Sequence, residues 1–74
     1  MPAPQTEQIE IVVNGEIQTV PQGLNLTGLL DFLKVDPQRV AVELNRSIVA
    51  RRDWTTAPID SGSTLEIVQF VGGG

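Results

Sequence analysis

One helical pattern lies between runs of alternating apolar residues, and this order limits the folds open to the chain. From Leu26 to Leu33, leucines recur at positions i, i+3, i+4 and i+7, which is typical of one amphipathic helix of about two turns. Asn25 is placed to cap the first turn. Asp36-Pro37 is expected to end the helix, because a residue before proline avoids the helical region. A single helix of this kind can cover one face of a small sheet.

Strand patterns flank the helix on both sides. Residues 9–13 alternate with a period of two and stop at Asn14-Gly15, the pair most typical of a tight hairpin, so residues 16–20 are expected to return antiparallel. In this return, Ile17 and Val20 have opposite parity, so one of them is exposed or the strand contains a bulge. Further strands are expected at residues 40–44, 48–49 and 64–71.

The segment of residues 50–63 is long for a connection. It contains Trp54, the single tryptophan, which we expect to pack over the edge of the core, and it is expected to turn at Asp60-Ser61-Gly62. Arg46, Arg51 and Arg52 near its start are expected to be solvated, with contact to a partner as the alternative. Two strands, a helix and further strands predict an α+β domain with one sheet around one helix.

Composition excludes several classes of function. The 74 residues allow one small domain, and the chain has neither cysteine nor histidine, which removes thiolate nucleophiles, imidazole bases and soft metal ligands. We therefore expect no enzymatic activity, no bound cofactor and no metal. The net charge of −4 with scattered basic residues gives no footprint for nucleic acid and favours a partner with a basic surface. Neither a membrane-spanning stretch nor a signal peptide is visible, so a cytoplasmic location is expected.

Three glycines, Gly72, Gly73 and Gly74, follow directly after the strand pattern of residues 64–71. Glycine has no Cβ and adopts almost any backbone conformation, so such a tail can enter a channel too narrow for larger residues. The carboxylate of Gly74 is the group of greatest chemical interest, although glycines at a chain end can also be an inert frayed terminus. We expect residues 1–8 to be a flexible extension, residues 9–71 the domain and residues 72–74 a flexible tail.

The order of elements, with residues 63–68 running into a terminal Gly-Gly, resembles ubiquitin-like β-grasp proteins. More narrowly, the chain is similar to the ThiS family of thiamine-pathway sulfur carriers. The similarity rests on residues 11–15, the Leu29-Leu30 pair, residues 42–49, Arg52-Asp53-Trp54 and residues 70–74. It implies a mixed sheet of four to five strands packed on one helix, with the closing strand in the middle beside the first.

The resemblance also implies a protein without an active site of its own. An adenylating enzyme related to ubiquitin-activating enzymes would use ATP, bound on that enzyme, to convert the Gly74 carboxylate to an acyl-adenylate. Sulfur from a cysteine desulfurase type of donor would replace AMP and leave a thiocarboxylate, which thiazole synthase would use. The alternatives are a sulfur carrier for molybdopterin synthesis (the small subunit of molybdopterin synthase), a ubiquitin-like protein modifier and a plain interaction domain.

Strand parity predicts a contact surface for a partner. If Leu65 and Ile67 point to the helix, then Glu66, Val68 and Phe70 lie on the opposite, outer face of the sheet. Valine and phenylalanine on an open face beside the tail would suit docking, whereas scattered exposed apolar residues are also normal on protein surfaces. Glu43, Asp60 and Glu66 are expected to be ordinary surface charges.

Overall fold

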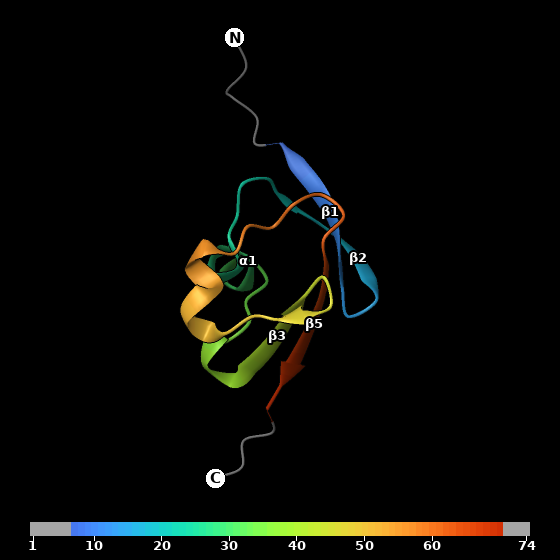
Figure 1. Cartoon of the computed structure of the whole chain (residues 1–74). Coiled ribbons are helices and arrows are strands. Elements are labelled where there is room, and N and C mark those ends of the chain that lie inside the picture. Colours follow the sequence, from blue (N-terminus) through green and yellow to red (C-terminus); the bar gives the residue numbers. More distant parts are fainter. Residues whose placement is uncertain (1–6, 71–74) are drawn as a thin grey trace.

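The structure is a computed structural model and describes residues 7–70 (Figure 1). Within them, the strands are β1 (Gln8–Val13), β2 (Glu16–Pro21), β3 (Val40–Leu44), β4 (Ser47–Ile48) and β5 (Thr64–Gln69). The helices are α1 (Leu26–Phe32) and two 3-10 helices, η1 (Pro37–Arg39) and η2 (Arg51–Thr56). The chain thus has the expected α+β composition.

The five strands form one mixed sheet in the order β2-β1-β5-β3-β4. β1 and β5 run parallel, with Val12 opposite Thr64, and the other neighbouring strands are antiparallel. The closing strand therefore lies in the middle of the sheet beside the first strand, as expected. The parallel pair joins segments from the two ends of the described chain.

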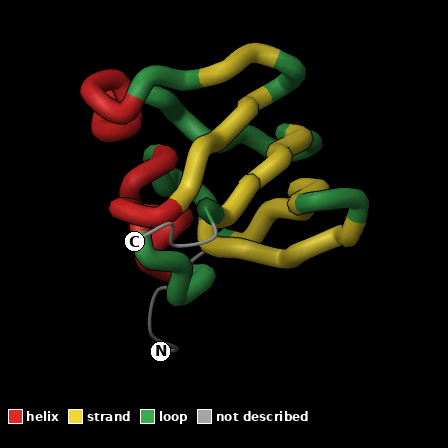
Figure 2. The backbone as a smooth tube through the Cα atoms, turned by 90° about the horizontal axis from the view of Figure 1, so that it is seen from below, coloured by secondary structure: helices red, strands yellow, loops and turns green. Residues whose placement is uncertain are grey.

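The core lies between the sheet and α1. Figure 2 shows α1 and η2 on the same side of the strands. Leu26, Leu29 and Leu30 of α1 have no exposed surface, and Trp54 of η2 is 4% exposed. The other buried apolar residues are Ile11, Val13, Val20, Val40, Val42, Ile59 and Leu65. The packing of Trp54 is confirmed, as are three of the four expected leucines, whereas Leu33 follows the helix and is half-buried.

Two tight turns build the hairpins on either side of β5. Asn14 and Gly15 have φ values of 50° and 85°, which is the left-handed pair that a two-residue hairpin loop requires. Asn45 and Arg46 repeat this geometry at 51° and 73° between β3 and β4. In β2, Val20 is buried and Ile17 is 70% exposed, so the ambiguity in this strand is settled by exposure of Ile17.

The prediction that Asp36-Pro37 ends the helix is wrong. The helix ends at Phe32, and Lys34 adopts a left-handed φ of 63°. The Val35 N–H donates to the Leu30 carbonyl at 2.9 Å, which is the bond that closes a Schellman-type end. Asp36 instead caps η1, since its side chain accepts from the Gln38 N–H at 2.9 Å.

The segment of residues 50–63 is more ordered than a connection. Its first half forms η2, which the sequence pattern did not indicate, and Trp54 donates its indole N–H to the Val49 carbonyl at 2.9 Å. The expected turn is present, because the Ser63 N–H donates to the Asp60 carbonyl at 3.0 Å. Among the described residues, no helix has the length and apolar character that crossing a membrane requires.

Candidate functional site

The candidate site begins where β5 leaves the sheet. Phe70 is the last described residue, and its N–H donates to the Arg39 carbonyl at 2.7 Å, so β3 and η1 hold the chain at this point. The expected reactive residue Gly74, with Gly72 and Gly73, lies outside the described residues, as do residues 1–6 of the expected N-terminal extension. β1 begins at Gln8. The fold therefore fixes the place from which residues 71–74 continue.

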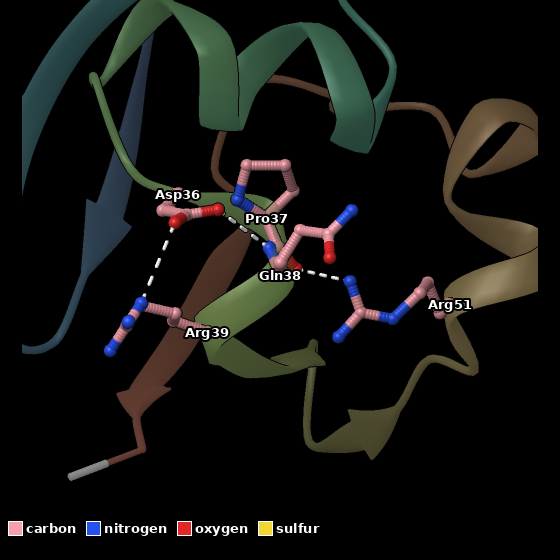
Figure 3. Close-up of polar contacts among 5 residues, drawn as sticks. All are labelled: Asp36, Pro37, Gln38, Arg39 and Arg51. Atoms are coloured by element: carbon pink, nitrogen blue, oxygen red, sulfur yellow. Dashed lines mark hydrogen bonds and ion pairs between the residues drawn. The ribbon is translucent and has the colours of Figure 1, made fainter. Parts of the chain in front are cut away.

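Polar contacts connect the residues of η1 next to the end of β5, as Figure 3 shows. Arg39 forms an exposed ion pair with Asp36, with Nε and Oδ2 3.7 Å apart. Arg51 donates to the Pro37 carbonyl, and its guanidinium lies 4.8 Å from the centre of the Trp54 ring. Arg51 is thus a structural link between η1 and η2 and not only a solvated charge.

The outer face of the sheet exposes the three residues expected there. Glu66 is exposed, Val68 is 58% exposed and Phe70 is 52% exposed, whereas Leu65 has no exposed surface. The parity assignment of β5 is therefore correct for these residues, and their role in binding stays a prediction. Neighbouring strands extend the face, because Ala41 lies opposite Val68 and Ile48 of β4 is 80% exposed.

A shallow hollow of about 220 Å³ opens on this face. It is lined by Ala41, Val42, Glu43, Ile48, Glu66 and Val68. We refer to Glu43, Ile48, Glu66, Val68 and Phe70 as the outer patch. Sequence reasoning did not include Glu43 and Ile48, although the alternation in residues 40–44 combined with a tight turn at Asn45 would have placed both on this face.

Two acidic residues are cross-strand neighbours in the outer patch. Glu43 of β3 lies directly opposite Glu66 of β5, and both side chains are on the outer face. Like charges in this position oppose strand pairing. The outer patch thus combines apolar surface with two neighbouring acidic residues.

The other basic residues near β4 differ in their surroundings. Arg52 is highly exposed and lies 3.9 Å from the carboxylate of its neighbour Asp53, a pair that contributes little to stability. Arg46 is exposed and occupies the second position of the β3–β4 turn. Within residues 7–70, no group of three acidic side chains lies close enough together to hold a metal ion.

A mixed sheet of five strands packed on one helix, with the closing strand in the middle beside the first, is the architecture of a ubiquitin-like β-grasp protein. Comparison with known families identifies which one. The model of the ThiS family matches residues 5–74, and the chain belongs to this family.

Solved structures agree with this assignment. The crystal structure of the thiamine biosynthesis protein ThiS from Geobacter metallireducens superposes with a TM-score of 0.78 at 36% sequence identity, and the match covers 89% of this chain and 100% of that chain. The solution structure of a thiamine biosynthesis protein from the same organism gives a TM-score of 0.74 at 36% identity, covering 89% of this chain and 88% of that chain. The expected β-grasp fold is confirmed.

Curated relatives include longer proteins. Two proteins named thiazole synthase, from Paramagnetospirillum magneticum (strain ATCC 700264 / AMB-1) and Magnetococcus marinus (strain ATCC BAA-1437 / JCM 17883 / MC-1), are 38% and 36% identical over 66 residues. The match covers 89% of this chain, which spans only 20% of the length of each of these relatives. An uncharacterized protein ycf40 from Porphyra purpurea is 32% identical over 68 residues, which are 92% of this chain and 96% of that protein.

Proposed function

We propose that this protein is a cytoplasmic sulfur carrier of thiamine biosynthesis, with Gly74 as the residue that carries sulfur. The observation that supports this most directly is the match of the ThiS family model over residues 5–74, which includes the glycine tail. The chain's own chemistry agrees with the role of a cosubstrate, because its sequence contains neither cysteine nor histidine. The reactive groups would then come from partner enzymes.

The proposed chemistry takes place at the Gly74 carboxylate. One carboxylate oxygen would attack the α-phosphorus of ATP on an adenylating enzyme, which forms an acyl-adenylate and releases pyrophosphate. The terminal sulfur of a donor's cysteine persulfide would then attack the carbonyl carbon and displace AMP. Cleavage of the resulting sulfur–sulfur bond by a thiol leaves the thiocarboxylate on Gly74. A glycyl carbonyl suits this attack because it carries no side chain that would hinder the sulfur.

Two partners follow from this role. The adenylating enzyme would dock on the outer patch, part of which lies on β5, the strand that leads to the tail. Thiazole synthase would receive the sulfur. In the two relatives named thiazole synthase, a sequence like this chain forms one part of a longer polypeptide, which supports an encounter between the carrier and such an enzyme.

The proposal is tested by incubating the protein with an adenylating enzyme of the ubiquitin-activating type, ATP and a cysteine desulfurase charged with persulfide, followed by a thiol that cleaves the sulfur–sulfur bond. We expect release of pyrophosphate, and an intact mass raised by the difference between a sulfur and an oxygen atom. The same protein without Gly74, or with one alanine added after it, serves as the control and should release no pyrophosphate. Activity in either control would contradict the assignment of Gly74, and a covalent amide adduct on another protein would favour a modifier.

A further inference from the structure

The side chain of Asn14 is joined to the backbone of β5 by two hydrogen bonds. Its Oδ1 accepts from the Ile67 N–H at 2.7 Å, and its Nδ2 donates to the Ile67 carbonyl at 3.2 Å. The two residues are 53 positions apart in the sequence. Only one orientation of the amide satisfies both bonds, since the oxygen must face the N–H and the nitrogen the carbonyl.

These two side-chain bonds replace backbone hydrogen bonds that β1 would make to β5 if the strand continued past Val13. The Val12 N–H donates to the Ser63 carbonyl at 2.9 Å, and the Asn14 N–H donates to the Leu65 carbonyl at 2.8 Å. In a regular parallel pair, the next two bonds to Ile67 would come from the carbonyl of residue 14 and the N–H of residue 16. The chain turns at Asn14 instead, and the side-chain amide takes the place of both backbone groups.

The amide shortens the part of β5 that is held from one edge only. Without it, hydrogen bonding on the β1 side would end at Leu65, and residues 66–70 would be joined only to β3 and η1. With it, the bonding reaches Ile67 and leaves residues 68–70. Val68 and Phe70 of the outer patch lie in this last part, which also leads to the tail.

Asn45 makes a related contact at the opposite end of the strand. It also has a left-handed φ, of 51°, and its Oδ1 accepts from the Thr64 N–H at 2.9 Å. The Asn45 N–H donates to the Thr64 carbonyl at 2.7 Å. The two turn asparagines therefore bind β5 from its two sides. Asn45, next to β3, binds the start of the strand, and Asn14, next to β1, binds it near its end.

We propose that Asn14 is a positioning residue for the carrier: it holds the end of β5 so that the outer patch and the tail meet the adenylating enzyme in one arrangement. This inference rests on the proposed carrier function. A strand end held from one edge samples more orientations, and ordering it on docking costs binding free energy. Loss of the Asn14 amide should consequently weaken docking, whereas loss of the Asn45 amide should not.

The test uses two matched variants of the full chain, Asn14→Gly and Asn45→Gly. Glycine adopts the left-handed φ of either turn without strain, so each variant removes the amide and little else. Both substitutions also raise the conformational entropy of the unfolded chain alike. Melting curves give the stability of each variant, and all rates are measured at a temperature where both are folded.

Hydrogen exchange of the free protein provides the first measurement. In Asn14→Gly, exchange at the Ile67 amide should accelerate at least about tenfold relative to Asn45→Gly, because this amide loses its acceptor. In Asn45→Gly, the Thr64 amide should be the one affected. Unchanged exchange at Ile67 in Asn14→Gly would overturn the inference, whether or not the protein is a carrier.

Steady-state release of pyrophosphate provides the second measurement. For Asn14→Gly, the KM for the carrier should rise at least about threefold while kcat stays within about twofold, since the ordering cost falls on docking. Asn45→Gly should keep the KM of the wild type. Equal KM values for the two variants would overturn the positioning role while leaving the carrier function intact. No pyrophosphate release from the wild type would instead refute the carrier function, and with it the effect on docking.

Discussion

At the scale of single residues, Phe70 combines a fixed backbone with a half-exposed ring. Its N–H is bonded to the Arg39 carbonyl, while 52% of the residue's surface is open to solvent. Because the backbone is already bonded, the ordering cost of Phe70 on docking is limited mainly to its side chain. Aromatic residues of this kind are over-represented among the few residues that dominate an interface.

Phe70→Ala should weaken association with the adenylating enzyme at least about tenfold, a factor that corresponds to about 1.4 kcal/mol. Its melting temperature should change little, because the ring is not part of the core. A binding titration and a melting curve measure the two effects. Ile17→Ala is the matched control, since Ile17 is 70% exposed on the edge strand β2, which β1 separates from β5, and should leave binding unchanged. A large fall in melting temperature with normal binding would assign Phe70 to the core.

At the scale of elements, α1 has only seven residues, so its packing and not its length keeps it helical. Leu30→Ala should lower the free energy of unfolding by about 2 to 5 kcal/mol, because it empties a site with no exposed surface. Phe32→Ala on the same helix, where the side chain is 46% exposed, should cost less than about 1 kcal/mol. Urea denaturation measures both, and equal costs would mean that α1 packs differently.

Elements with local signals could be predicted from the sequence. The Asn14-Gly15 turn, the leucines of α1 and the alternation in residues 64–70 each depend on neighbouring residues, and the structure contains all three. The end of α1 could not be predicted, because Lys34 is an ordinary residue that takes a left-handed φ only when the packed helix and η1 require it. The 3-10 helix η2 likewise forms around the burial of Trp54, which is a tertiary contact.

The candidate site was predictable to the same degree. Strand parity placed Glu66, Val68 and Phe70 on the outer face correctly. The patch was incomplete without Glu43 and Ile48, because their contribution depends on which strand neighbours β5. The contacts of the Asn14 side chain with Ile67 could not be predicted either, since they require the parallel register of β1 and β5.

At the scale of the whole molecule, the net charge of −4 should act on association over a distance. The opposed pair of Glu43 and Glu66 concentrates part of this charge on the outer patch. We expect the association rate with a basic adenylating enzyme to fall as salt rises from about 0.01 M to 0.15 M, as the screening length shortens from about 30 Å to 8 Å. Stopped-flow measurements would show this, whereas a rate independent of salt would argue against a basic partner surface.

The parallel pairing of β1 and β5 affects when the protein can fold during its synthesis. β1 can pair with its neighbour in the middle of the sheet only after β5 has been synthesised. The hairpin of β1 and β2 therefore cannot form the complete core before that point. Contacts this distant along the chain make folding slower than local ones do. The strand that completes the fold is also the strand that leads to the glycines. A truncated chain that lacks β5 would therefore remain unfolded and be open to proteolysis. Such a chain would not compete with the intact protein for the activating enzyme.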